Sequence, residues 1–500
     1  MRGDRTASGL GAVALLAFLA ACSVGPDFKR PDAPAAPGYG SAQPGAMTAS
    51  AGGDGGEVQR FVAGQDIPGQ WWTLFQSPKL SALVDEALKV NPSITAAEAA
   101  LRQSRELYLA QRGGYYPTIQ AGFSAQRANN ADATIANPTV SPSSTYSLYT
   151  PQLSLSYAPD VFGATARSVE AAQSQVASSR FQLQAAYVTL SSNVVVTAIQ
   201  EASLRGQIVA TERLLQLLGD VTETVRKRRA IGTATQIDLL TQESAEAQTA
   251  ATLPPLQRQL GQARDALTAL LGRLPSEEPV DTFALEDLTL PADLPLSLPS
   301  RLVAQRPDVR QAEENLHMAS AQVGIAMTNL LPQFSIDASA GSSAFQLGQL
   351  FSANTNFWSL GASLSQTLFD GGSLRHRRRA ADAALDQAAA QYRSAVILAC
   401  QNVADTLRAL QADAQAFQAS AKAERAAKDA LELAKGQYQL GAVSLLVVMN
   451  AEQAYRQGEL ALIQARANRY ADTAGLFQSL GGGWWNRSGE TLDGTTRSAN

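Results

Sequence analysis

Apolar side chains recur at seven-residue steps along a proline-free stretch from Gly163 to about Arg229. The positions that keep this step are Val169, Val176, Leu183, Leu190, Thr197, Leu204, Thr211, Leu218 and Val225. A second stretch, from Ser373 to Tyr438, places apolar residues three, four or seven positions apart. A sustained seven-residue period predicts helices that pack as coiled coils, each about 100 Å long at about 1.5 Å per residue. Two further stretches, Thr235 to Leu271 and Ser444 to Leu480, predict helices that return beside the long ones.

Ahead of each long helix, apolar and polar side chains alternate. The alternating stretches are Ile119 to Arg127, Gln152 to Tyr157, Phe334 to Gly341 and Trp358 to Leu364. A period of two predicts strands with one apolar and one polar face. The polar face consists of Ser, Gly and Gln, with Asp337 as its charged residue, and this suits the water-filled lumen of a membrane barrel. Half-buried hairpins of a soluble sheet would show the same alternation.

The pattern occurs twice along the chain. The matched landmarks are Asn91-Pro92 with Arg306-Pro307, Gly232 with Gly441, and Leu271-Gly272 with Leu480-Gly481, at offsets that fall from 215 to 209 residues. A steady offset predicts a duplicated strand, strand, long helix, helix unit. The copies differ at Pro254-Pro255, where the second copy has Ile463-Gln464, so the first returning helix should kink or split.

The N-terminus predicts a secretory signal. Arg2 and Arg5 precede an apolar run from Leu10 to Ala21 of about twelve residues, too short for a spanning helix of about twenty. Leu19-Ala20-Ala21-Cys22 looks like a lipobox, which implies cleavage before Cys22 and its acylation; an ordinary signal peptide with a chance cysteine is the alternative. No later apolar run reaches spanning length, so a membrane crossing would need the strands. Four strands cannot close a barrel, and the chain would therefore oligomerise.

The amino-acid composition excludes several other classes of protein. Alanine and glutamine make up about a quarter of the chain, which favours closely packed helices. A net charge of -4 with 17% charged residues fits neither a disordered chain nor a nucleic-acid partner. Two cysteines and two histidines exclude a disulfide scaffold and a histidine metal cage. No catalytic or phosphate-binding motif is present, so we expect no enzyme activity, no metal and no cofactor beyond a lipid on Cys22.

These features together resemble a known family. The lipobox, the segment from Val24 to Pro31, Trp71-Trp72 with Phe75, and the doubled unit are similar to the TolC-like outer-membrane efflux family, in its NodT/OprM-type lipoprotein branch. The resemblance implies an α+β membrane protein, a homotrimer whose 12-stranded β-barrel sits among outer-membrane lipids and continues as a long α-helical barrel in the periplasm. It also implies a passive exit duct served by a periplasmic adaptor (membrane fusion) protein and an inner-membrane RND-type pump. The alternatives are the outer-membrane component of type I protein secretion and a lipid-anchored coiled-coil structural protein without a pore.

The expected organisation follows from the repeat. The predicted segments are a signal peptide (1–21), an acylated tether (22–66), periplasmic helices of the first repeat (67–117), a first barrel hairpin (118–158), a first long helical hairpin (159–272), a linker (273–300), a helix of the second repeat (301–331), a second barrel hairpin (332–369), a second long helical hairpin (370–481) and a C-terminal tail (482–500).

A first group of candidate site residues lies in the turns between the long helices and the returning helices. These residues are Gly232, Thr235, Asp238, Gly441 and Ser444. A glycine after a helix and a Thr or Ser before the next are ordinary caps. Turn chemistry explains these residues as well as a binding role does. The resemblance adds contact with the adaptor.

The candidate site residues of the second kind are Leu446, Asn450 and Gln453. By resemblance they match a Leu, an Asp and an Arg that line the closed periplasmic mouth of related channels, so the leucine is kept and both charges are lost. A carboxylate ring favours cations, and an asparagine does not. The hypothesis is steric closure through Leu446 with weak charge selectivity.

Arg375, Arg377, Arg378 and Arg379, with His376, open the second long helix. Cations are unfavourable at a helix N-terminus. Lipid headgroups or Asp370 could compensate them, and a solvated charge run is the alternative.

Overall fold

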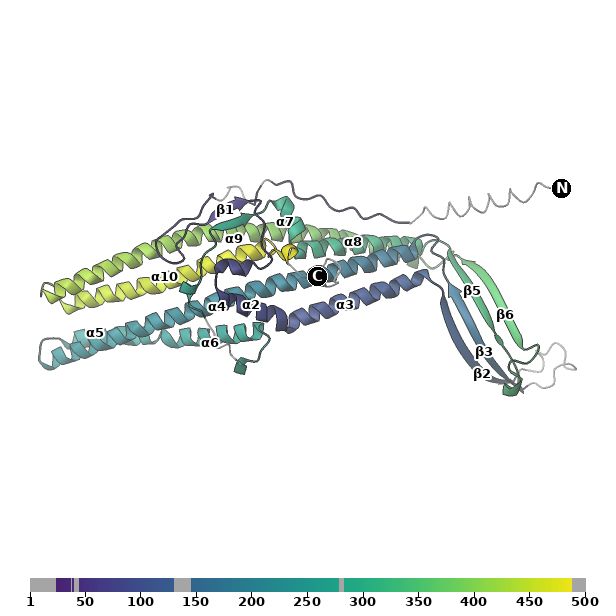
Figure 1. Cartoon of the computed structure of the whole chain (residues 1–500), viewed down its shortest axis with the longest axis horizontal. Coiled ribbons are helices and arrows are strands. Elements are labelled where there is room, and N and C mark those ends of the chain that lie inside the picture. Colours follow the sequence, from purple (N-terminus) through teal and green to yellow (C-terminus); the bar gives the residue numbers. More distant parts are fainter. Residues whose placement is uncertain (1–23, 37, 40–44, 130–144, 278–282, 488–500) are drawn as a thin grey trace, which may run out of the picture. The chain divides into compact units, whose positions relative to one another are not determined.

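The computed structural model describes residues 24–36, 38–39, 45–129, 145–277 and 283–487 of the 500-residue chain (Figure 1). The chain forms two compact units. The first comprises Met1–Arg30, Arg102–Ser178 and Glu313–Gln391; the second comprises Pro31–Leu101, Ser179–Ala312 and Tyr392–Asn500. The signal segment with Cys22 and the tail beyond residue 487 lie outside the described residues.

The first unit contains a four-stranded antiparallel sheet in the order β2-β3-β5-β6. The strands are β2 (Thr118–Asn129), β3 (Thr145–Tyr157), β5 (Gln333–Ser342) and β6 (Asn356–Ser365). Strands at all four predicted positions are thus confirmed. The hairpins of the two repeats join through β3 and β5, where Gln152 faces Gly341 and Tyr157 faces Ile336.

The register of the sheet separates its two faces. Residues directly opposite each other on neighbouring strands share a face. Apolar residues pair with apolar ones, as in Ile119 with Leu155 and Ala338 with Leu360. Polar residues pair likewise, and the Ser339 and Ser359 hydroxyls lie 2.8 Å apart.

Further polar contacts lie on the same face. The Ser156 hydroxyl donates to the Asp337 carboxylate at 2.9 Å. Asp337 also accepts from the Ser335 hydroxyl at 2.8 Å, so its charge has two hydrogen-bond donors. Together with the register, these contacts confirm the predicted division into an apolar and a polar face.

Long helices flank the strands in the sequence. They are α3 (Pro92–Arg112), α4 (Ala164–Ala230), α8 (Pro307–Thr328) and α9 (Ser373–Gln439), and each contributes residues to both units. The Asp160 carboxylate caps the start of α4 by accepting the backbone N–H groups of Thr165 and Ala166 at 2.9 and 2.8 Å. No helix in the described part of the chain combines the length and apolar character that a membrane span requires.

In the second unit, the seven-residue positions of α4 form a packed seam. Leu183, Leu190, Leu204, Thr211 and Leu218 are all buried. On α9 the buried positions include Tyr392, Ala399, Val403, Leu407, Leu410 and Phe417. The predicted coiled-coil faces are therefore confirmed in this unit.

The returning helices differ between the repeats as predicted. The first is split into α5 (Gln236–Ala250) and α6 (Leu253–Leu270), and Pro254 lies in the first turn of α6. The second, α10 (Leu445–Ser479), is continuous. Proline has no backbone N–H to continue the α5 ladder, and the first turn of a new helix is the place where that loss is tolerated.

The rest of the second unit packs around α10. Strands β1 (Arg60–Ala63) and β4 (Asp293–Leu296) form a parallel pair. In the sequence, β1 is followed by α2 (Pro78–Val90) and β4 by α7 (Pro299–Gln305). Trp71 is fully buried and stacks on Phe477 with ring centroids 5.2 Å apart. Arg469 of α10 is 1% exposed and donates to the carbonyls of Gly55 and Glu57. Its charge is thus satisfied by backbone oxygens, and burial lowers its pKa.

Candidate functional site

The turn between α4 and α5 reverses the chain with a left-handed glycine. Gly232 has φ 72°, a conformation that costs glycine little and other residues more. The N–H and the hydroxyl of Thr233 both donate to the Arg228 carbonyl, at 2.8 and 3.0 Å. The exposed carbonyl at the end of α4 is therefore satisfied within the turn.

Thr235 and Asp238 form a reciprocal capping box at the start of α5. The Thr235 hydroxyl oxygen accepts the Asp238 N–H at 3.1 Å, and the Asp238 carboxylate accepts the Thr235 N–H at 2.8 Å. The Thr235 hydroxyl also donates to that carboxylate at 2.7 Å. These donors lower the pKa of Asp238, which keeps the carboxylate ionised at the positive end of α5.

The turn between α9 and α10 keeps the glycine and lacks the box. Gly441 has φ 76°. Ser444 is the N-cap of α10, and its side chain makes no capping hydrogen bond. Val447 stands at the position of Asp238, and its N–H bonds to the Ser444 carbonyl at 3.1 Å. The two turns thus share a backbone shape and differ in charge and in capping strength.

Both turns lie at the same end of the second unit (Figure 1). The Arg228 guanidinium donates to the Tyr438 hydroxyl at 3.3 Å and joins the end of α4 to the end of α9. Around this contact several large apolar side chains are exposed: Ile231, Ile237, Leu240, Leu440 and Leu446. Five large apolar side chains are therefore left uncovered near the ends of the two hairpins.

An ion pair joins the two helices of each hairpin at equivalent positions. In the first repeat Arg226 contacts Glu243 at 3.2 Å. In the second, Lys435 contacts Glu452 at 3.5 Å, and Arg456 adds a contact with Glu452 at 3.1 Å. Glu452 is buried, and both cations lie beside its carboxylate.

Leu446, Asn450 and Gln453 form a single stripe on α10, because residues four and seven positions apart share a helix face. Leu446 is 59% exposed, Asn450 is exposed and Gln453 is half-buried. Met449 and Glu452, on the adjoining side of the helix, are buried within the unit. The stripe therefore presents one apolar and two neutral polar groups to whatever adjoins α10.

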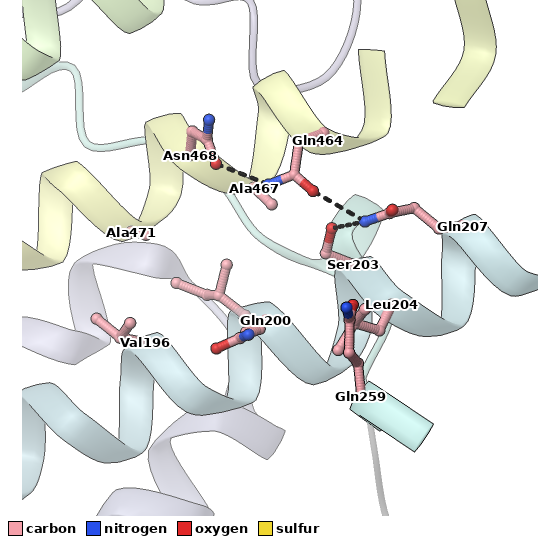
Figure 2. A pocket seen from close by; sticks show the side chains of 11 residues that line it. Val196, Gln200, Ser203, Leu204, Gln207, Gln259, Gln464, Ala467, Asn468 and Ala471 are labelled. Carbon is pink, nitrogen blue, oxygen red and sulfur yellow. Dashed lines mark hydrogen bonds between the residues drawn. The ribbon is translucent and has the colours of Figure 1, made fainter. Parts of the chain in front are cut away.

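A cavity of about 310 Å³ lies between α4, α6 and α10 in the second unit. Its polar lining consists of a serine and neutral amides: Gln200, Ser203, Gln207, Gln259, Gln464 and Asn468. Figure 2 shows Gln207 and Gln464 pointing toward each other, with a hydrogen bond of 3.0 Å between their amides. Gln464 also donates to Asn468 at 2.8 Å, so the amides bind one another and the cavity has no charged wall.

Asp472 of α10 faces Asp413 of α9. Burial, together with the hydrogen bond and the negative charge of Asp413, raises the pKa of Asp472 to about 7. This pair of acids is absent from the sequence-based site residues, because Asp413 and Asp472 lie on different helices and only packing brings them together.

The segment from Val24 to Arg30 is held within the first unit. The Val24 N–H donates to the Phe162 carbonyl at 3.1 Å. Arg167 is 4% exposed and donates to the Asp27 carboxylate at 2.7 Å. Phe28 stacks on His317 with centroids 4.3 Å apart. Cys22 itself lies outside the described residues, so its predicted acylation stays a prediction.

No cluster of three metal-ligating side chains occurs among the described residues. Cys400 is a free, half-buried thiol, and burial raises its pKa. A thiol with a raised pKa is less nucleophilic at neutral pH.

Comparison with known proteins places this geometry in a family. The model of the outer membrane efflux protein family matches residues 83–273 and 298–482, which is most of the chain. The chain is 29% identical over 423 residues to the pyoverdine export outer membrane protein OpmQ of Pseudomonas putida, covering 84% of this chain and 89% of OpmQ. It is 28% identical over 482 residues to the outer membrane protein OprJ of Pseudomonas aeruginosa, covering 96% of this chain and 97% of OprJ.

The fold agrees with a solved channel. The structure of the outer-membrane channel OprN superposes with a TM-score of 0.81 at 28% identity, covering 93% of this chain and all of the OprN chain. Both repeats, including the sheet and the long helices, therefore have counterparts in a channel of known structure.

Proposed function

Because the chain belongs to the outer membrane efflux protein family, we propose that it is the outer-membrane exit duct of a tripartite efflux pump, a channel and not an enzyme. It conducts drugs or other small solutes passively from the periplasm to the outside. The observation that carries this proposal is the duplicated unit of strands and long helices, which matches the family in both halves of the chain.

The membrane part is proposed to be the two hairpins of residues 118–158 and 332–369. Their apolar residues are exposed in the single chain, including Ile119, Trp358 and Leu360 at 68%, 80% and 70%. A face of this kind suits lipid, and the opposite face of Ser, Gly and Gln suits water. The outer strands, β2 and β6, leave backbone groups to pair. Three copies would supply twelve strands and close a barrel around a water-filled lumen.

The periplasmic part is proposed to be the α-helical barrel built by α4, α5, α6, α9 and α10 of three copies. The buried seams account for packing within one copy, and small alanine-rich faces suit close packing between copies. The turns at Gly232 and Gly441, with Thr235, Asp238 and Ser444, would contact the periplasmic adaptor that links the duct to an inner-membrane RND-type pump. The exposed apolar side chains around both turns support that role.

The mouth of the duct is proposed to lie at the stripe of Leu446, Asn450 and Gln453. In a trimer, three copies of Leu446 would form an apolar constriction, and the neutral amides would add little charge selectivity. An acyl chain on Cys22 would add a second attachment to the outer membrane.

Deleting the gene and measuring growth with dyes, detergents and antibiotics tests the function. Increased sensitivity that is restored by the wild-type gene is expected. An unchanged sensitivity profile together with the loss of a secreted protein would contradict the efflux function and indicate a duct for protein secretion. As a matched pair, the gene with Gly232→Val should fail to restore resistance, and the gene with Gly113→Ala should restore it. Gly232 adopts a positive φ that valine tolerates poorly, whereas a Cβ at Gly113 meets open space.

A further inference from the structure

A group of arginines follows the last strand of the sheet. Arg375, Arg378 and Arg379 lie in the first turns of α9, and their spacing of three and four residues places them on one helix face. All three are exposed. Among the described residues, the one ion pair of this group joins Arg378 to Asp382 at 3.8 Å. The face therefore carries excess positive charge.

Asp370 is engaged with the backbone at the start of α9. Its carboxylate accepts the backbone N–H groups of Gly372 and Leu374, at 2.8 and 2.6 Å, and so caps the helix. The described residues show no ion pair between Asp370 and these arginines, so its compensation of their charge stays a prediction. The positive end of the helix dipole disfavours cations at this place, so their presence calls for an anion from outside the helix.

Two apolar side chains stand immediately before the arginines. Leu368 is 93% exposed and Phe369 is 90% exposed. They follow β6, whose apolar residues Trp358 and Leu364 are exposed on the face proposed to meet lipid. The chain thus passes from an apolar strand, through an apolar pair, to an arginine face. That order matches the passage from acyl chains to headgroups at a bilayer surface.

We propose that Arg375, Arg378 and Arg379 bind the phosphate headgroups of anionic phospholipids in the periplasmic leaflet of the outer membrane, while Leu368 and Phe369 enter the acyl-chain region. The proposal rests on the proposed function, because it requires the sheet to lie in that membrane. Guanidinium groups suit this ligand, since they donate two parallel hydrogen bonds to a phosphate and stay charged at every physiological pH.

A second basic run in the same chain lacks these features. Lys227, Arg228 and Arg229 lie at the end of α4, where the helix dipole favours cations. Arg228 bonds to Tyr438, and Lys227 lies 3.8 Å from Glu223. Removing three cations here changes the net charge as much as removing the arginines of α9, so this run provides a matched control.

Native mass spectrometry of the detergent-solubilised full-length protein, titrated with phosphatidylglycerol or phosphatidylcholine, tests the proposal. The wild type and K227Q/R228Q/R229Q are expected to bind phosphatidylglycerol more tightly than phosphatidylcholine. In R375Q/R378Q/R379Q the affinity for phosphatidylglycerol should fall roughly fivefold for each arginine removed, at unchanged oligomeric mass. R375K/R378K/R379K, which keeps the charge, should keep the preference.

Three outcomes would overturn the proposal. An unchanged preference in the glutamine variant would show that the arginines do not bind lipid. A changed oligomeric mass would assign them to contact between copies. Equal competition by inorganic phosphate would indicate a site for a free anion. Bilayer conductance of the same preparations reports on the duct separately, so failure of the lipid site is distinguishable from failure of the proposed function.

Discussion

Asp238 and Val447 occupy the same position of the two turns, and they give the returning helices different first turns. Asp238 completes a reciprocal box with Thr235, whereas Val447 has only its backbone N–H to offer, and that donates to the Ser444 carbonyl. A side-chain cap accepts hydrogen bonds from the free N–H groups of the first turn, and this reduces fraying of the helix end. We therefore expect α5 to begin more firmly than α10.

The substitutions Thr235→Ala and Ser444→Ala test this difference. Loss of the Thr235 cap should speed amide hydrogen exchange in the first turn of α5 roughly fivefold, the effect of a typical cap. Ser444→Ala should leave exchange at the start of α10 almost unchanged, because that side chain makes no capping bond. Equal effects at both turns would contradict the assignment.

The neutral stripe on α10 predicts the ion selectivity of the mouth. Asn450→Asp would place a carboxylate on an exposed position, and in a trimer a ring of three. We expect a several-fold rise in cation over anion permeability in planar bilayers, and Asn450→Ala should change selectivity little. Leu446→Ala should raise conductance without changing selectivity. Strong cation preference in the wild type that Asn450→Ala abolishes would refute steric closure.

Site residues with local causes could be predicted from the sequence, and those that depend on packing could not. Gly232, Thr235 and Asp238 follow from turn chemistry within seven positions. The contact of Arg228 with Tyr438 joins residues 210 positions apart and leaves no local pattern. Burial of Glu452 likewise depends on how α9 packs on α10.

At the scale of elements, the segment from Val24 to Arg30 is held by shape as well as charge. A Cβ on Gly25 would lie 2.5 Å from the Gly324 Cα, and Gly25 has φ 109°. Arg30 pairs with Glu313 at 2.9 Å. The segment therefore docks through a glycine contact that no other residue type can reproduce.

Gly25→Ala should release this segment. Trypsin cleavage after Lys29 of the folded protein should then speed up, by roughly tenfold if the docked state loses the stability typical of a backbone clash. Gly38→Ala is the control, because a Cβ there meets open space. Equal cleavage of the two variants would mean that the glycine contact does not hold the segment.

The acids between α9 and α10 predict a pH dependence. The pKa of Asp472 rises from 3.8 to about 7, so the folded chain keeps a proton that the unfolded chain releases in that range. Stability should therefore be full below about pH 4 and fall as the pH rises to about 7.

Guanidinium unfolding, followed by helical circular dichroism at pH 5 and pH 8, measures this effect. Asp472→Asn should remove on the order of 1 kcal/mol of the difference, discounted for solvent exposure. Asp429→Asn, at an exposed position of α9, should leave it unchanged. A difference that persists in Asp472→Asn would exclude the pair as its source.

The helices and strands could be predicted from the sequence where the hydrophobic period was uninterrupted. Pro254-Pro255 predicted the break between α5 and α6 correctly. The start of β3 was missed, since the strand begins at Thr145 and not at Gln152. Proline normally ends a strand, but β3 continues through Pro151, which pairs with Phe123 of β2, and Tyr149 resumes the contact with β5 by bridging Ala344.

At the scale of the whole molecule, one chain leaves three kinds of surface uncovered. The sheet has two outer strands, β2 and β6, and an exposed apolar face. The ends of the helical hairpins carry exposed leucines and isoleucines. Assembly with further copies, lipid and an adaptor would cover all three, and the excess of alanine and glutamine suits helices that pack side by side against water.

Single-channel recording of the purified full-length protein in planar bilayers tests whether the chain forms a conducting channel. We expect discrete conductance steps with weak ion selectivity from a trimer. A folded trimer or monomer that inserts in the membrane and conducts no ions would contradict it.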